Sequence, residues 1–356
     1  MLLRRARPVA AARAGATSQK AATLVVLAVA LVFPLFEGAN VSVMGIAIEV
    51  LTYGLVTLAL NLLMGYGGQV SIGHGGLLAV GAYTTAIVAT RFRLPFIVVL
   101  VLAGVVTAVV GLLLGLPAGR LRSHYLAVAT LGFGVAVPQI ALNLGSLTGG
   151  FTGLIVPTPY IGTIALNEPV PLYYVALGIL ALSVVAIRSI LASPTGRRFM
   201  AVRDSEDTAP AMGINVGRTK VVIFTVSSFF CGLAGYVFAL NNGIVEPDSF
   251  TFSLSLFFFA AVIVGGLASI WGSLIGAALL VVVQQESVSL GGFSEAILGA
   301  AVVVMLLLAP GGLAALPRRL RGLVAGAWRP RPEAVSAAGP LDQHRAPPSA
   351  GSPGEG

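Results

Sequence analysis

The sequence predicts an all-α integral membrane protein with about ten transmembrane helices. Hydrophobic residues make up 57% of the chain and charged residues only 10%, whereas a soluble domain carries about 25% charge. Mean hydropathy is +0.96, and apolar stretches of about twenty residues recur, each long enough to cross roughly 30 Å of hydrocarbon. The 44 glycines agree with this class, because small residues let membrane helices approach closely.

The apolar stretches divide the chain into three regions. Residues 1–21 form a basic segment, 22–316 a transmembrane domain, and 317–356 a tail with seven prolines and six glycines. The tail lacks apolar periodicity and cannot bury enough surface to offset its ordering entropy, so we expect it to be disordered. The expected spans are 22–36, 44–65, 70–90, 95–118, 124–145, 171–192, 220–241, 253–268, 270–288 and 293–309.

The first expected span is short and has an alternative interpretation. Arg4, Arg5, Arg7 and Arg13 precede it, as in a cleaved signal peptide. No small-x-small cleavage pattern follows at residues 36–39, so we expect a retained span. Its removal would leave the orientation of the remaining spans unchanged.

The basic residues predict the orientation. If both termini are cytoplasmic, only Arg91 and Arg93 of the 21 lysines and arginines fall on the other side. The segments 146–170 and 242–252 contain neither residue type, which agrees with the positive-inside rule. The net charge of +8 does not indicate nucleic-acid binding, because the basic residues lie between and beyond the apolar segments.

The sequence gives no sign of an enzyme or of a bound cofactor or metal. It lacks the G-x-x-x-x-G-K-[ST] phosphate loop. His74, His124 and His344 have no metal-ligand spacing, and the single cysteine, Cys231, excludes an intrachain disulfide. If ATP drives transport, another subunit must hydrolyse it.

The polar segment 193–219 is the expected contact with such a subunit. Asp207-Thr208-Ala209, followed after three residues by Gly213, resembles the E-A-A-x-x-x-G coupling loop of ABC importer permeases. The resemblance implies a short helix, a turn at the glycine and a second short helix along the membrane. The sequence departs from the pattern at Asp207, at Thr208 and at Pro210, and an ordinary charged loop is the alternative. The candidate coupling residues are Arg203, Asp204, Glu206, Asp207, Ala209 and Gly213.

A longer set of motifs is more specific. Residues 60–83 begin LNLLMGYGGQVSIGHGG, and further motifs follow in order: LR at 121–122, YLA at 125–127, TLGFG at 130–134, LTGG at 147–150, GINV at 213–216, PDSF at 247–250, GGL at 265–267 with WG at 271–272, and APGGL at 309–313. The chain resembles the branched-chain amino-acid permease family of ABC importers, in its LivM branch, over about residues 45–316.

The glycines between Gly65 and Gly76 predict a broken helix. Non-helical backbone at membrane depth is tolerated only inside protein or beside a water-filled cavity, and transporters use such breaks to contact polar solutes. The candidate pathway residues are Asn61, Gln69, Ser71, His74 and Asn143. The alternatives are a tightly packed turn, a satisfied buried histidine, and asparagines that bridge helices. Residues 67–72 resemble 265–270, a weak indication of two inverted five-helix repeats.

The resemblance implies the permease subunit of an ATP-driven importer of branched-chain amino acids in the bacterial plasma membrane. It also implies a LivH-branch permease partner, two ATP-binding cassette subunits and an extracytoplasmic solute-binding protein. A urea or short-amide importer of the same family is the first alternative. A secondary transporter is the second, but no paired charges mark an ion site at mid-membrane.

Overall fold

The computed structural model describes residues 29–36, 40–92, 94–119, 123–161, 164–288, 299–300, 303 and 312–313, all within the unit Met1–Leu316. The N-terminal segment 1–21, the tail 317–356, most of the expected span 293–309 and the first part of the expected span 22–36 lie outside the described residues.

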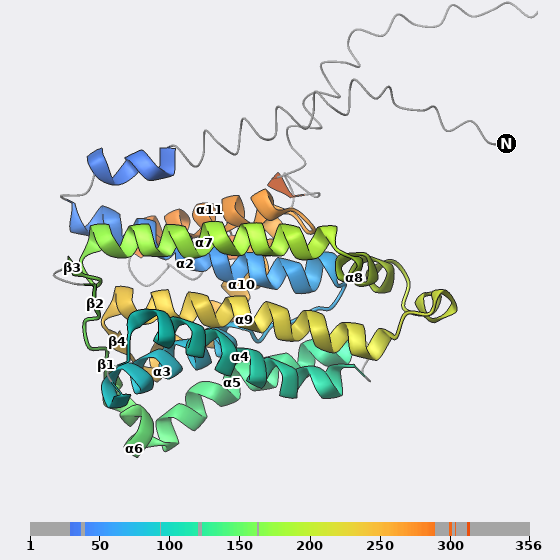
Figure 1. Ribbon diagram of the computed structural model, residues 1–356, viewed down its shortest axis with the longest axis horizontal. Helices are drawn as coiled ribbons and strands as arrows, with labels where there is room; N and C mark the ends of the chain where they lie inside the picture. Colours follow the sequence, from blue (N-terminus) through green and yellow to red (C-terminus); the bar gives the residue numbers. More distant parts are fainter. Residues whose placement is uncertain are drawn as a thin grey trace, which may run out of the picture. The chain divides into compact units, whose positions relative to one another are not determined.

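The described helices form one bundle and run side by side along its long direction (Figure 1). The long helices are α2 (Val41–Asn61), α3 (His74–Phe92), α4 (Phe96–Ala118), α5 (Ser123–Asn143), α7 (Pro169–Ala192), α9 (Val216–Asn242), α10 (Phe252–Gly265) and α11 (Ile270–Val288). A π-helical turn, η1 (Leu62–Tyr66), extends α2, and α8 (Pro194–Asp204) with the 3-10 turn η3 (Ala209–Met212) joins α7 to α9.

The end of the bundle opposite α8 carries short elements that the all-α prediction did not include (Figure 1). Strand β1 (Leu154–Ile155) pairs antiparallel with β4 (Ile244–Val245), and β2 (Tyr160–Ile161) pairs with β3 (Ile164–Ala165). The short helices α6 (Gly145–Thr148), η2 (Gly150–Thr152) and η4 (Pro247–Ser249) complete the connections. We call this the strand end and the opposite one the α8 end.

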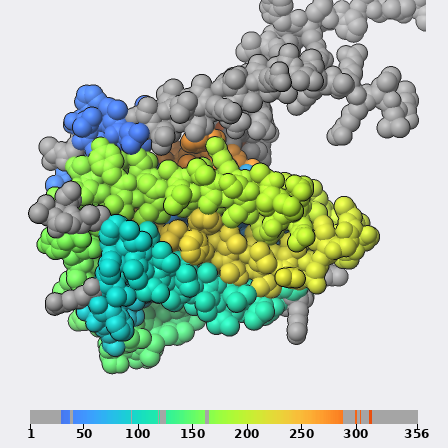
Figure 2. Space-filling model, viewed as in Figure 1, coloured from blue at the N-terminus to red at the C-terminus, as the bar shows by residue number. Residues whose placement is uncertain are grey.

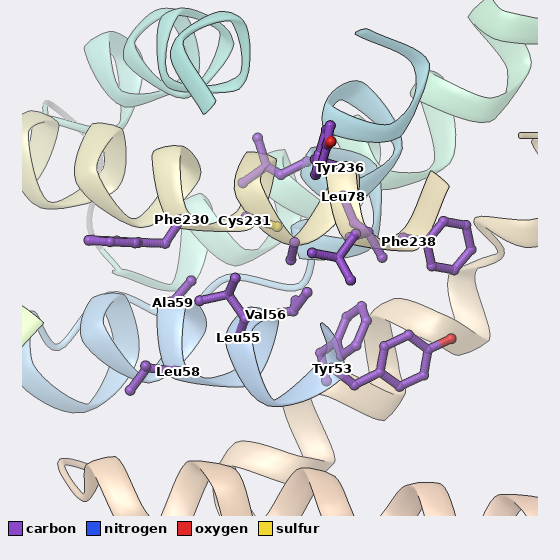
Figure 3. Close-up of a cluster of buried hydrophobic side chains, with 14 of the residues drawn as sticks. Tyr53, Leu55, Val56, Leu58, Ala59, Leu78, Phe230, Cys231, Tyr236 and Phe238 are labelled. Carbon is purple, nitrogen blue, oxygen red and sulfur yellow. The ribbon is translucent and has the colours of Figure 1, made fainter. Parts of the chain in front are cut away.

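The core lies where α2, α3 and α9 meet (Figure 3). Every residue of α2 from Thr52 to Asn61 is buried. Glycines bring α3 and α9 into close contact, because a Cβ at Gly81 would lie 2.7 Å from the Gly232 carbonyl oxygen. Helix α4 also packs against α9, and its other side exposes a row of apolar residues, as expected of a helix that faces lipid.

The prediction of about ten spans is confirmed only in part. Among the described residues, seven helices are long and apolar enough to cross a membrane. Helix α3, expected at 70–90, is not one of them. Its buried face consists largely of glycines, alanines and threonines, because a helix enclosed by protein does not need a strongly apolar surface. Helix α10 has 14 residues, or about 21 Å, and reaches spanning length only together with η4.

Candidate functional site

The chain breaks its helical course between Tyr66 and His74. The π-helical turn η1 ends at Tyr66, residues 67–73 are non-helical, and Gly68 takes a left-handed φ of +68°. The predicted break is therefore present, although the expected span at 70–90 starts four residues too early, because the glycines interrupt hydrogen bonding as far as Gly73. The segment aligned with it contains a second break, after α10, where Gly266 has a φ of +110°.

Asn61 joins these two breaks. Its side-chain Nδ2 donates to the Ser269 carbonyl oxygen at 2.9 Å and to Ser273 Oγ at 2.6 Å. Its Oδ1 accepts from the Ala268 backbone N–H at 2.9 Å. Ala268 has a φ of 56°, a conformation that costs an alanine about 1–2 kcal/mol, and the hydrogen bond that it donates to Asn61 holds it there. Asn61 is fully buried, so in this conformation it bridges helices, the alternative that the sequence left open.

His74, at the start of α3, closes a second buried network. Its Nδ1 lies 3.1 Å from Ser71 Oγ and its Nε2 lies 3.0 Å from Ser227 Oγ. Ser227 donates its hydroxyl proton to the Ala59 carbonyl oxygen at 2.6 Å, so its oxygen must accept from His74. A neutral imidazole in this setting has its proton on Nε2 and accepts at Nδ1 from Ser71. The network ties the break to both α2 and α9.

Gln69 is buried beside this network and only half satisfied. Its Nε2 donates to the Lys220 carbonyl oxygen at 3.3 Å, while Oε1 has no hydrogen-bond partner among the described residues. Asn143 lies apart from the others: it is exposed at the end of α5, and its Nδ2 donates to the Gln139 carbonyl oxygen at 2.7 Å. The structure thus brings Gln69, Ser71 and His74 together and leaves Asn143 at the strand end.

The segment 193–219 forms the α8 end of the bundle (Figure 2). Ser193 caps α8 by accepting from the Gly196 N–H at 3.4 Å. Pro210 sits in the first turn of η3, where its missing N–H costs nothing. Gly213 then takes a left-handed φ of +74°. The expected second short helix is absent from this described segment, because Asn215 directly caps α9 through the Arg218 N–H at 2.9 Å.

Two contacts connect this segment to the helix break. Arg203 Nη1 donates to the Gly65 carbonyl oxygen at 3.1 Å. Lys220 Nζ lies 2.7 Å from Glu206 Oε2, and the carbonyl of the same lysine accepts from Gln69. The candidate coupling residue Arg203 therefore contacts the backbone just before the break. Glu206 reaches the candidate pathway residue Gln69 only through Lys220.

The remaining candidate coupling residues differ in exposure. Asp204 forms an ion pair of 2.7 Å with its neighbour Arg203, and Ala209 is buried against the bundle. Asp207 and Gly213 are exposed, as is Met212, which directly precedes Gly213. An incoming protein would therefore meet Asp207, Met212 and Gly213 directly.

Sequence reasoning missed two members of this site. Lys220 is only 3% exposed and neutralises Glu206 from the first turns of α9. Glu206 lies in the turn between α8 and η3, so no single helix or strand relates the two residues. The carbonyl of Gly65 is the second. The only sequence feature that could have indicated this carbonyl is the cluster of glycines. Glycines leave the backbone uncovered, so that an arginine side chain can reach it.

The chain was compared with known protein families, curated proteins and solved structures. Residues 42–310 match the family model described as branched-chain amino acid transport system / permease component. The chain is 35% identical over 319 residues to the high-affinity branched-chain amino acid transport system permease protein LivM of Salmonella typhimurium, covering 83% of this chain and 74% of the relative. It is 23% identical over 266 residues to a probable LivM of Methanocaldococcus jannaschii, covering 65% and 77%.

A second type of permease is also similar. LivH of Escherichia coli is 23% identical over 288 residues, covering 75% of this chain and 92% of the relative. No solved structure matches the chain. The family model covers most of the chain and the LivM relative most of both sequences, so this protein belongs to the family of permease components of branched-chain amino acid transport systems.

Proposed function

We propose that the chain is the membrane-spanning permease subunit of an ATP-driven importer and carries leucine, isoleucine and valine across a bacterial plasma membrane. The observation that carries the proposal is the 35% identity to a LivM permease along most of both chains. The contact between the segment 193–219 and the helix break supports it, because a permease driven by a separate ATPase needs such a connection.

The proposed partners follow from what the chain lacks and from its relatives. It has no phosphate-binding loop, so two ATP-binding cassette subunits would hydrolyse ATP. A LivH-type permease, to which this chain is similar over 75% of its length, would be the second membrane subunit. An extracytoplasmic solute-binding protein would deliver the amino acid and provide most of the selectivity.

The proposed mechanism is a shift between inward-open and outward-open bundles. An ATPase subunit would bind at Asp207, Met212 and Gly213 and move α8. The Arg203 hydrogen bond to Gly65 and the Glu206–Lys220 ion pair would pass that movement to the break at residues 67–73. A break is suited to this role, because its backbone can rearrange without unwinding a continuous helix.

The test is reconstitution with purified partners in proteoliposomes. We expect uptake of radiolabelled leucine that requires ATP inside, the binding protein outside and both permease subunits. Urea and acetamide serve as competing solutes, and uptake of these in place of leucine would identify the alternative importer. Leucine uptake that continues without ATP or ATPase subunits would identify a secondary transporter and contradict the proposal.

A further inference from the structure

A small polar cavity lies between α2 and the last turns of α9, near the strand end of the bundle. Its volume is about 80 Å³, and its lining residues are Glu49, Thr52, Tyr53, Phe238, Asn241 and Asn242. Figure 3 shows Tyr53 of α2 and Phe238 of α9 on the same side of the core. None of its lining residues belongs to the segment 193–219 or to the helix break, so the cavity is a separate feature.

The groups around this cavity include several hydrogen-bond acceptors. Thr52 donates its hydroxyl proton to the Ile48 carbonyl oxygen at 2.8 Å, which leaves its oxygen able to accept. Asn242 Nδ2 donates to the Phe238 carbonyl oxygen at 3.0 Å, so its amide oxygen remains as an acceptor. Tyr53 interacts with the Glu49 carboxylate one turn away. No lysine or arginine lines the cavity.

Glu49 is the unusual member. It is only partly exposed, about two turns into a membrane-spanning helix, and it forms no ion pair within the described part of the chain. A carboxylate at that depth is costly and generally marks a functional contact. Tyr53 gives the carboxylate a hydrogen bond but no positive charge, and no lysine or arginine lines the cavity. The cavity therefore favours a cation that can donate several hydrogen bonds.

We propose that this cavity binds the ammonium group of a zwitterionic solute, with Glu49 as its counter-ion and the oxygens of Thr52, Asn241 and Asn242 as additional acceptors. The size agrees, because a cavity of about 80 Å³ is larger than the space that a water-sized group such as an ammonium needs. The side chain of the solute would lie outside the cavity, beside Phe238. The inference rests on the proposed function and adds a preference for amino acids over uncharged urea or amides.

The experiment measures equilibrium binding of radiolabelled leucine to the assembled transporter in nanodiscs without the binding protein. Isoamylamine, which lacks the carboxylate, and 4-methylpentanoate, which lacks the amine, are the competitors, in choline chloride buffer and again in sodium chloride. Glu49→Gln removes the charge, Glu49→Asp retains it, and Glu168→Gln is the matched control, since Glu168 is exposed at the same end outside the cavity. Subunit co-purification and thermal unfolding show which variants are folded.

We expect Glu49→Gln to weaken leucine binding by about tenfold or more, because a charge-assisted hydrogen bond is lost, and Glu49→Asp to weaken it less. Isoamylamine should displace leucine from the wild type and 4-methylpentanoate should not. Unchanged binding in Glu49→Gln, equal competition by the two analogues, displacement of leucine by sodium, or no leucine binding by the wild type would overturn the site. Uptake assays with ATP and binding protein run in parallel. If the wild type takes up leucine and Glu49→Gln binds it unchanged, this site alone is rejected. If the wild type takes up no leucine, the proposed function is rejected.

Discussion

Arg203 on α8 donates a hydrogen bond of 3.1 Å to the carbonyl oxygen of Gly65, in the last turn before the helix breaks. A side chain at Gly68 would crowd the same arginine, because a Cβ there would lie 3.0 Å from Arg203 Cγ. The break and the segment proposed to contact an ATPase are therefore packed together through an arginine and bare backbone.

Replacing Arg203 tests whether this contact transmits movement. Hydrogen bonds to charged groups contribute about 1.5–3 kcal/mol, and we expect a value near the lower limit because the arginine side chain is 34% exposed. Arg203→Ala should leave the ATPase subunits bound, reduce leucine uptake, and weaken the stimulation of ATP hydrolysis by solute. Arg198→Ala, on the exposed face of the same helix, is the control. Equal loss in both variants would point to the charge of α8 instead of the contact with Gly65.

The ion pair between Glu206 and Lys220 should matter for stability. Removing one partner of a buried pair is strongly destabilising, but Glu206 is 37% exposed, so we expect Glu206→Gln to lower the free energy of unfolding by about 1–3 kcal/mol. Asp207→Asn, one position away and exposed, should not affect it. Thermal unfolding in detergent measures both.

Asp207 is tested in a second assay, co-purification of the ATPase subunit. Charge reversal of Asp207 should weaken co-purification of the ATPase subunit, and high salt should mask the effect, since an exposed ion pair is screened. In the unfolding assay, a stable Glu206→Gln variant together with an unstable Asp207→Asn variant would contradict a stabilising role of the Glu206–Lys220 ion pair.

Gly213 allows a test of backbone conformation alone. A Cβ there would meet nothing within 4 Å, yet φ is +74°, so Gly213→Ala introduces no clash and only the cost of a left-handed alanine, about 1 kcal/mol. Asparagine tolerates this conformation and should cost less. Gly178→Ala is the control, because that helical glycine also has open space and an ordinary φ.

The readout for Gly213 is binding of the ATPase subunit, measured by co-purification at several salt concentrations. We expect the order glycine, asparagine, alanine from strongest to weakest, with Gly178→Ala equal to the wild type. Equal binding by Gly213→Ala would show that the turn can relax and does not position the docking surface.

Gly65 should tolerate no side chain. A Cβ there would collide with the Asn61 side chain and with the backbone of Ala268. We expect Gly65→Ala to abolish stable expression, whereas Gly45→Ala, at a position on α2 with nothing within 4 Å, should be neutral or slightly stabilising. Fluorescence-detected size-exclusion chromatography compares the two. Monodisperse Gly65→Ala protein at normal levels would show that the two breaks can separate.

Orientation is tested by reporter fusions. Among the described basic residues, all but Arg91 lie at the α8 end (Figure 1), as the positive-inside rule requires of a cytoplasmic surface. A reporter active only in the cytoplasm should function when fused after Arg203 and fail after Gly153. Activity at both positions, or only at Gly153, would reverse the proposed topology.

Much of the fold could be predicted because membrane helices depend on local composition. The spans expected at 95–118 and 270–288 nearly coincide with α4 and α11. The glycine-rich break was predictable for the same reason, since glycine density is a local property. The exceptions were α3 and α10, whose character depends on neighbours: burial lets α3 carry glycines and threonines, and η4 supplies the length that α10 lacks.

The candidate site was predictable only in part, because its contacts join distant segments. The positive φ of Gly213 followed from the motif, but the partners of Arg203 and Glu206 did not. Periodicity can place a residue on a face of its own helix. It cannot say which carbonyl or carboxylate of another element will meet that face.

The amide of Asn61 has a consequence for biogenesis. The turn at 266–269 connects two membrane spans. Its Ala268 N–H and Ser269 carbonyl both bond to a side chain that is synthesised about two hundred residues earlier. We therefore expect α10 and α11 to reach their final packing only after α2 is in place. The order of synthesis matches this requirement, and a permuted gene that placed α10 and α11 first would present the unpartnered turn to the insertion machinery.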